Sequence, residues 1–232
     1  MKKAVEIFYD KFILKGGYKT ALSGLVTTLE IAVFGLMIGI LLGTLIAIVK
    51  VTPKYKRSFR ILGGICDVYV AIFRGTPIVV QLLLGYFVIL PLFNIIMDPV
   101  LVAIIIFGCN SGAYVSEIMR AGIQSVDAGQ LEAGRAVGLP YRTAMLKIVI
   151  PQSIKNILPT LGNEFIVLIK ETSVASFIAV VDLTKAFVSI GSANYEYLIP
   201  YTMLALVYLV LVLIISFGIK KMERRLARSE RK

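Results

Sequence analysis

Residues 20–49 read TALSGLVTTLEIAVFGLMIGILLGTLIAIV, an apolar run in which Glu30 is the only charged side chain. An α-helix of about 20 such residues is long enough to cross the hydrocarbon core of a bilayer. Comparable runs follow at about 61–90, 100–121, 157–181 and 197–219. Hydrophobic residues make up 58% of the chain, against about 45–50% in a soluble domain. We therefore predict an all-α, polytopic membrane protein with five transmembrane helices.

Two features of these runs predict how the helices pack. Gly35, Gly39 and Gly43 are spaced four residues apart, which predicts a face that lets a second helix approach closely. Glu30 must face protein or water, because a carboxylate in contact with lipid is costly. The second run is interrupted by the segment 74–77, Arg-Gly-Thr-Pro, where the proline removes a backbone donor. Such a break at membrane depth requires covering protein or a water-filled cavity.

The distribution of Lys and Arg predicts the orientation. The turn at 50–60, the stretch at 120–155 and the C-terminal stretch from Lys220 together carry seventeen of the 25 basic residues, and six lie on the opposite side. Basic residues accumulate on the cytoplasmic side of a membrane, so the N-terminus is expected outside and the C-terminus inside. We expect an amphipathic interfacial segment at 1–19, a transmembrane domain at 20–220 with a cytoplasmic loop at 122–155, and a basic cytoplasmic tail at 221–232. The net charge of +11 is explained by this topology and does not indicate nucleic-acid binding.

The cytoplasmic stretch 132–151 reads EAGRAVGLPYRTAMLKIVIP. Glu132 and Ala133 are expected to open a short helix that Gly138 ends, because glycine accepts a left-handed conformation. Pro140 starts a second short helix, which runs toward Pro151. From the residues alone, this stretch is either an ordinary loop or a docking surface for a soluble partner. The chain contains no Gly-x-x-x-x-Gly-Lys-Ser/Thr phosphate loop of its own.

Polar side chains within the spans are the candidate functional residues, since such groups usually line a cavity or pair with each other. The candidates for substrate binding are Arg74, Asn110, Tyr114, Glu117, Asn163, Glu164 and Lys170. The alternative is that they form ion pairs between helices, such as Lys170 with Glu117 or with Glu164. Glu171 and Arg120, nearer the ends of their spans, are expected to be structural. The chain has no histidine, and its two cysteines both fall within predicted spans, so we expect no metal site.

The stretch from Glu132 resembles a known family. Glu-Ala-Gly, Gly138, nine residues and then Ile-Val-Ile-Pro at 148–151 is similar to the Glu-Ala-Ala loop of ABC-importer permease subunits. Gly134 stands where that family often has alanine, and Ile150 where it often has leucine. Segment 74–77 and the segments Leu-Gly-Asn-Glu-Phe at 161–165 and Lys-Glu-Thr-Ser at 170–173 resemble the polar amino-acid branch, of the histidine, glutamine and arginine type. The similarity covers roughly residues 17–220.

The resemblance implies a permease subunit of an ATP-driven importer for a polar amino acid, basic ones included, in a prokaryotic plasma membrane. It implies a partner set of a second permease subunit, expected to be a copy of this chain although a different chain would also serve, two ATP-binding-cassette subunits and an extracytoplasmic amino-acid-binding protein. ATP and magnesium would bind to the partner ATPase, so this chain would bind no cofactor and would not itself be an enzyme. The contact with the ATPase would use Glu132, Ala133, Gly138, Pro140 and Pro151.

Two other functions remain open at this point. The first is a secondary amino-acid transporter driven by an ion gradient, with Glu117, Glu164 and Lys170 as coupling groups. The second is a membrane anchor or assembly factor that transports nothing. An intramembrane enzyme is disfavoured, because the chain offers no histidine, no metal-ligand pattern and no serine paired to a base.

Overall fold

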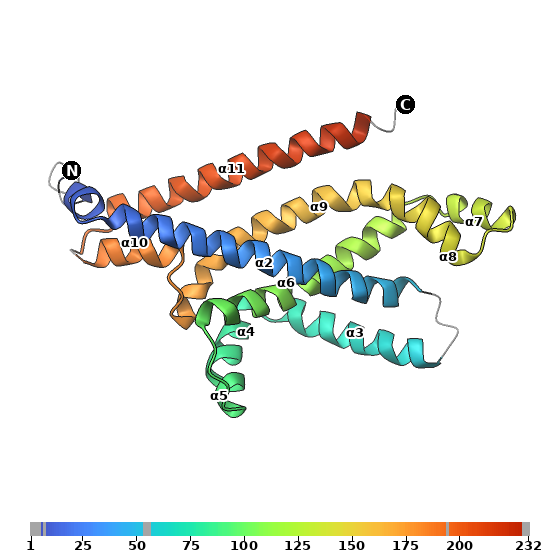
Figure 1. Cartoon of the computed structure of the whole chain (residues 1–232), viewed down its shortest axis with the longest axis horizontal. Helices are drawn as coiled ribbons and strands as arrows, with labels where there is room; N and C mark the ends of the chain where they lie inside the picture. Colours follow the sequence, from blue (N-terminus) through green and yellow to red (C-terminus); the bar gives the residue numbers. More distant parts are fainter. Residues whose placement is uncertain (1–5, 7, 53–56, 194, 229–232) are drawn as a thin grey trace.

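The computed structural model describes residue 6 and residues 8–52, 57–193 and 195–228, and within them the regular structure is helical. The long helices lie roughly along one direction, with α10 at one end and α7 and α8 at the other (Figure 1). The long helices are α2 (Gly17–Val51), α3 (Arg57–Gly75), α6 (Pro99–Gln124), α9 (Ile150–Glu171) and α11 (Leu198–Arg228). The shorter elements are η1 (Asp10–Leu14), α4 (Ile78–Leu84), η2 (Gly85–Ile89), α5 (Leu90–Leu92), α7 (Ala128–Ala136), α8 (Tyr141–Ala144), η3 (Met145–Val149), η4 (Thr172–Ile178) and α10 (Leu183–Ser192).

Three of the predicted spans are confirmed as single helices by length and composition, namely α2, α6 and the part of α11 up to Leu226. The second predicted span is a bent pair, α3 followed by the helical segment Ile78–Leu92, whose axes differ by 105°. The pair counts as a fourth span if its two parts cross together. The bend lies at the predicted break, because Pro77 adopts an extended conformation and α4 begins after it.

The fourth predicted span, 157–181, is wrong in its second half. Helix α9 ends at Glu171, the 3-10 helix η4 follows, and Ala179 adopts a left-handed conformation with φ of 66°. The loop predicted at 182–196 contains helix α10, whose first turn is capped by Asp182 through the amides of Thr184 and Lys185. Ala175, Ile178 and Val180 are buried against other helices of the same chain, so their apolarity did not signal a membrane crossing.

Helix α10 packs on the first half of α2. A methyl group at Gly24 would lie 2.6 Å from the backbone oxygen of Asp182, so the two segments approach as closely as glycine allows. Phe187 is buried in this contact, and the Phe12 ring stacks on it at a centroid distance of 6.1 Å. The predicted interfacial segment 1–19 therefore touches protein through Phe12. Residues 1–5 and 7 of that segment lie outside the described residues.

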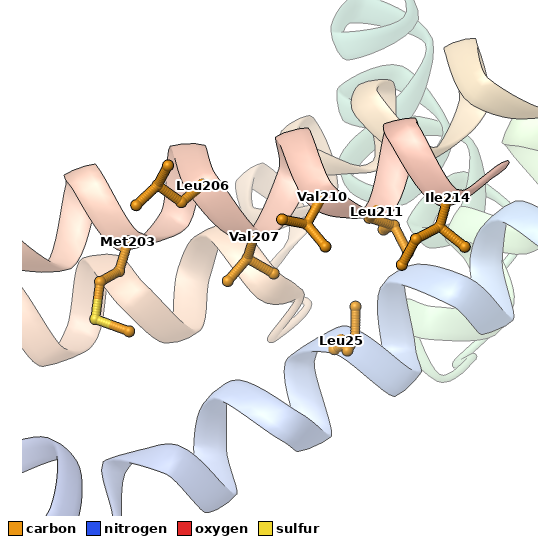
Figure 2. Close-up of a pocket in the computed structure, with 7 residues that line it drawn as sticks. All are labelled: Leu25, Met203, Leu206, Val207, Val210, Leu211 and Ile214. Atoms are coloured by element: carbon orange, nitrogen blue, oxygen red, sulfur yellow. The ribbon is translucent and has the colours of Figure 1, made fainter. Parts of the chain in front are cut away.

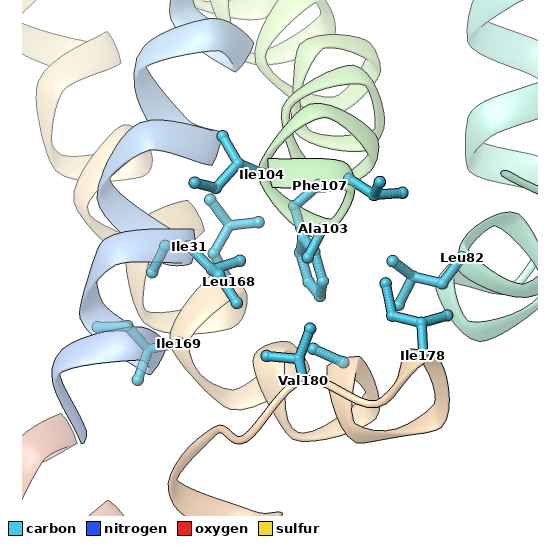
Figure 3. Close-up of a cluster of buried hydrophobic side chains, with 12 residues drawn as sticks. Ile31, Leu82, Ala103, Ile104, Phe107, Leu168, Ile169, Ile178 and Val180 are labelled. Atoms are coloured by element: carbon cyan, nitrogen blue, oxygen red, sulfur yellow. The ribbon is translucent and has the colours of Figure 1, made fainter. Parts of the chain in front are cut away.

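The predicted glycine stripe packs on α6. Methyl groups at Gly39 and Gly43 would lie 2.7 Å from Ser111 Oγ and 2.6 Å from Val115 Cγ1. The main core lies beside this contact and centres on the buried Phe107 ring, with side chains from α2, α4, α9 and η4 around it (Figure 3). Glu30 is exposed on the chain taken by itself.

The segment after α6 differs from the expected two short helices. Helix α7 begins at Ala128, four residues before Glu132, because Asp127 caps it through the amide of Gly129. Gly138 adopts the predicted left-handed conformation, with φ of +88°. The second helix is not a separate short one, because α8 continues through η3 into α9 without a break. The five-residue π turn η3 directly precedes the Ile150–Pro151 pair, and η2 stands in the same relation to Pro91. A wider turn before proline accommodates the missing N–H and the ring.

Helix α11 extends into the predicted tail as far as Arg228. The first eight residues of the tail are therefore a continuation of the last predicted span. Residues 229–232 lie outside the described residues.

Candidate functional site

A polar joint holds the break between α3 and α4. The Gln81 side-chain amide donates to the backbone oxygens of Phe73 and Thr76, at 2.9 and 3.0 Å, and to the Thr76 hydroxyl at 2.9 Å. The buried Asn110 amide donates to the same Phe73 oxygen at 3.2 Å and to the Gln81 side-chain oxygen at 3.0 Å. A helix that ends at membrane depth leaves carbonyl groups without partners. Gln81 and Asn110 supply the missing donors.

The joint holds Arg74 at the end of α3, facing α6. Its guanidinium carbon lies 5.3 Å from the centre of the Tyr114 ring, within range of a cation–π interaction. Arg74 and Tyr114 both line a cavity of about 450 Å³ at the break, which we call the break cavity. Its other walls are Gly75, Thr76, Pro77, Ile78, Asn110 and Glu171.

The same two residues also line a second cavity of about 420 Å³, the loop-side cavity. It extends along α6 past Glu117 to Ser125 and is closed on the α9 side by Asn156 and Thr160. The two cavities thus meet at the Arg74–Tyr114 contact. Cation–π contacts of this kind contribute about 0.5–2 kcal/mol. A ligand that forms a stronger interaction with the Arg74 guanidinium could therefore displace the Tyr114 ring from it.

Glu117 is held in an ion network at the same end of the bundle as the 122–155 stretch. One of its carboxylate oxygens accepts from the Lys50 ammonium at 2.8 Å, and the other accepts from the Arg120 guanidinium at 2.7 and 3.1 Å. Lys50 also pairs with Asp67 at 3.0 Å, so the network joins α2, α3 and α6. The alternative in which Lys170 pairs with Glu117 or Glu164 is wrong for the described residues, where Lys170 makes no ion pair within 4 Å.

The three predicted site residues on α9 lie apart from the break cavity. Glu164 accepts a hydrogen bond from Ser111 at 3.1 Å, between α9 and α6. Asn163 is exposed on the outer side of α9. Lys170 is exposed and lines a different cavity, shared with α10 and α11. The structure therefore brings Arg74, Asn110, Tyr114 and Glu117 together and leaves the α9 set outside.

A further cavity, between α2 and α11, has walls of another kind. Its lining side chains are all apolar and point from both helices into a space of about 340 Å³ (Figure 2). It offers no partner to a charged or zwitterionic molecule. The residues that line this cavity are Leu25, Met203, Leu206, Val207, Val210, Leu211 and Ile214 (Figure 2).

The segment from 128 to 151, which we call the elbow, protrudes at one end of the bundle (Figure 1). Gly134 is the buried residue of α7, and a methyl group there would lie 2.8 Å from Ile148 Cδ1 and 3.3 Å from Ala144 Cβ. Glu132, Ala133 and Gly138 are exposed. Pro140 caps α8, and Pro151 is exposed in the first turn of α9. The elbow is therefore compact, exposed on its outer side and covalently continuous with α9.

Two contacts tie the elbow region to other helices. The Tyr141 hydroxyl donates to the Val51 backbone oxygen at the end of α2, at 3.5 Å. Just beyond the elbow, the Asn156 amide donates to the Ser125 hydroxyl at 2.8 Å. The elbow region is thus in contact with the ends of α2 and α6 and is continuous with α9.

Comparison with known proteins identifies the family. Residues 35–228 match the model for the binding-protein-dependent transport system inner membrane component. The chain belongs to this family. It is a multi-pass component of the bacterial inner membrane, and membership of this family does not favour the alternative of a permease driven by an ion gradient.

Relatives of the permease have related descriptions. The arginine transport system permease protein ArtQ of Bacillus subtilis is 41% identical over 205 residues, which are 88% of this chain and 91% of that protein. The glutamine transport system permease protein GlnP of Escherichia coli is 35% identical over 208 residues, which are 88% of this chain and 92% of that protein. A crystal structure of an amino acid ABC transporter with histidines matches with a TM-score of 0.84 at 40% identity, covering 91% of this chain and 96% of that one.

Three residues of the permease site, Gln81, Lys50 and Asp67, were not among the residues predicted from the sequence. Gln81 lies in an apolar run, four residues after Pro77, and only a search for donors near the proline break would have found it. Lys50 lies at the end of the first predicted span, where charged residues are expected in any membrane protein, and Asp67 lies within the second predicted span. Their pairing with Glu117 depends on how α2, α3 and α6 pack.

Proposed function

We propose that this permease is the membrane-spanning subunit of an ATP-driven importer for a polar amino acid. The similarity to proteins described as arginine and glutamine transport permeases supports the substrate class. The observation that carries the coupling is the elbow, which is exposed, compact and continuous with the helix α9.

In the proposed topology, α2, the α3–α4 pair, α6, α9 and α11 form five spans. Seventeen of the basic residues then lie on the cytoplasmic side, with the N-terminus outside and the C-terminus inside. Helix α9 carries Glu164, Lys170 and Glu171, and charges within a span are expected to face protein or a water-filled cavity. The elbow lies on the cytoplasmic side in this arrangement.

Each elbow fits into a cleft of an ATPase subunit, with Glu132, Ala133, Gly138, Pro140 and Pro151 at or near the contact. ATP and magnesium bind to that partner, and this chain binds no cofactor. Closure of two ATPases moves two elbows, and the continuous α8–η3–α9 helix passes the displacement to the transport path. The complex holds two permease subunits, which we propose are copies of this chain, and an extracytoplasmic amino-acid-binding protein.

The proposed substrate path follows the intramembrane polar groups. Arg74 and Tyr114 lie where two cavities meet, and Asn110 and Glu117 line one cavity each. Asn163, Glu164 and Lys170 remain proposed path residues that the substrate would reach at other stages of the cycle. A membrane anchor without transport is the competing proposal, and it needs none of these groups.

The experiment is reconstitution of the permease with its ATPase and binding protein in liposomes. We expect uptake of L-arginine or L-glutamine that requires ATP inside and persists without any ion gradient. Uptake that follows an ion gradient without ATP would replace this proposal with the secondary transporter. Absence of uptake under both conditions would favour the anchor.

Coupling is tested by substitutions on the elbow. Glu132→Lys and Gly138→Asp are expected to abolish co-purification of the ATPase while leaving membrane insertion unchanged. Glu223→Lys is a matched control, because it reverses an exposed carboxylate on α11 outside the elbow. Retained ATPase binding in both elbow variants would refute the proposed contact.

A further inference from the structure

The break cavity contains charges of both signs whose bonding capacity is unused. The Arg74 guanidinium contacts the Tyr114 ring and makes no ion pair within 4 Å among the described residues. Glu171, the last residue of α9, lines the same cavity. Within the part of the chain that the structure describes, its carboxylate accepts no side-chain hydrogen bond and pairs with no cation within 4 Å. The neighbouring residue Lys170 is on the same helix. The charge of Lys170 attracts the Glu171 carboxylate electrostatically, without an ion pair between the two side chains.

The loop-side cavity also has a carboxylate, but that carboxylate is already bound. Both oxygens of Glu117 accept from Lys50 and Arg120. A ligand ammonium group would have to compete with two charge-assisted hydrogen bonds there. It meets no such competition at Glu171.

A third group of the break cavity is Asn110, which is buried. Its two N–H groups are used by the Phe73 backbone oxygen and by Gln81. The amide oxygen of Asn110 therefore remains as an acceptor beside the cavity. The break cavity is thus lined by unused hydrogen-bond donors of Arg74 and by unused acceptors of Asn110 and Glu171.

We propose that the break cavity binds the zwitterionic head of an α-amino acid, with its carboxylate on Arg74 and its ammonium group on Glu171. Asn110 accepts from the same ammonium group, and Gln81 is the positioning residue that holds Arg74 by fixing the break. This inference rests on the proposed function and extends it to Glu171 and Gln81. The carboxylate takes the place of the Tyr114 ring at Arg74, because a charge-assisted hydrogen bond is stronger than a cation–π contact at this kind of site.

The arrangement predicts discrimination by head group. A molecule that lacks the ammonium leaves Glu171 without a partner, and a molecule that lacks the carboxylate leaves Arg74 on its aromatic ring. Hydrogen bonds to charged groups are worth about 1.5–3 kcal/mol, which corresponds to about 10- to 100-fold in affinity. The side chain of the amino acid is not read by these residues.

The test uses the reconstituted complex of permease, ATPase and binding protein, with L-arginine as the transported probe. Agmatine, which lacks the carboxylate, and deamino-arginine, which lacks the ammonium, are added as inhibitors from the side of the membrane opposite the binding protein. In the unmodified complex, L-arginine should inhibit about 10- to 100-fold more strongly than either analogue.

Glu171→Gln should bring L-arginine and deamino-arginine to within a few-fold of each other while preserving the preference over agmatine. Arg74→Gln should do the reverse. Gln81→Leu should weaken binding of L-arginine relative to agmatine without changing the preference over deamino-arginine, because it acts through Arg74. Glu30→Gln is the matched control, since Glu30 is an exposed carboxylate on α2 that lines neither the break cavity nor the loop-side cavity, and it should leave both preferences unchanged.

Amounts of ATPase co-purified with each variant show whether the variant is folded. If Glu171→Gln is assembled and keeps the full preference for L-arginine over deamino-arginine, the zwitterion site is refuted while the proposed importer function stands. If Glu164→Gln removes that preference instead, the ammonium site lies on the other side of α6. A complex that transports no amino acid at all would overturn the proposed function, and this inference with it.

Discussion

Replacement of Glu117 by glutamine is expected to destabilise the permease through its ion network. The Lys50 ammonium lies 2.8 Å from one Glu117 oxygen. Coulomb attraction at that distance is about 6 kcal/mol at an effective dielectric constant of about 20. The two side chains are only 16% and 20% exposed, so desolvation offsets most of this attraction.

Neighbouring groups reduce the net effect further. Lys50 keeps Asp67 at 3.0 Å, and Arg120 keeps the Gln124 side-chain oxygen at 2.6 Å. The coupling between Lys50 and Glu117 should therefore be about 1–2 kcal/mol. For a chain of this size, a loss of that order lowers the midpoint of thermal unfolding by about 3–6 °C.

The assay is a double-mutant cycle on the detergent-solubilised complex. Glu117→Gln, Lys50→Met and the double variant are heated, and the fraction that remains monodisperse is measured by size-exclusion chromatography. We expect the double variant to be only slightly less stable than the worse single variant. Additive losses would refute the pairing. Unchanged stability combined with an altered preference between basic and neutral amino acids would show instead that Glu117 binds substrate.

Three further predictions concern glycines, and Gly64→Ala serves as the control for each because a methyl group there meets nothing within 4 Å. Gly43→Ala should cost about 1–3 kcal/mol, since its methyl group would lie 2.6 Å from an α6 side chain and 2.8 Å from an α6 backbone nitrogen. This cost is read from thermal unfolding of the complex. Gly162→Ala should also destabilise, and adding Ile219→Ala should recover part of the loss, because the three nearest atoms all belong to that isoleucine side chain. Gly138→Ala should cost about 1–2 kcal/mol through its left-handed conformation alone and should reduce ATPase co-purification.

The outcomes that would contradict these predictions differ. A Gly43 variant as stable as the control would mean that α2 and α6 separate without cost. A Gly162 and Ile219 double variant with fully additive losses would show that the two residues do not meet. A Gly138 variant with normal stability and normal ATPase binding would show that the elbow does not need the left-handed turn.

Several features of the permease were predictable because the signal is local. The apolar runs at 20–49, 100–121 and 197–219 became α2, α6 and α11, since transfer of a helix into lipid depends on the composition of that helix. Pro77 breaks the second run, and Gly138 takes a left-handed conformation, for reasons contained in single residues. The glycine stripe of α2 correctly predicted close packing of a second helix, because glycine has no side chain to hold the two backbones apart.

Local signals were misleading where one property has two causes. The residues from 172 to 181 are mostly apolar, and an apolar side chain gives the same sequence signal whether it is buried in lipid or in protein. In the structure α9 ends before this segment and α10 packs on α2, and the apolar side chains of Ala175, Ile178 and Val180 belong to the protein core.

By itself, the sequence determined the helical class, the break in the second run, the turn of the elbow and the presence of charges within the spans. Only the tertiary structure decided which charges are neutralised and which are free. Lys50 and Glu117 are 67 residues apart, and Arg74 and Glu171 are further apart still. Whether such groups meet depends on the crossing of helices, which the spacing along one helix does not contain.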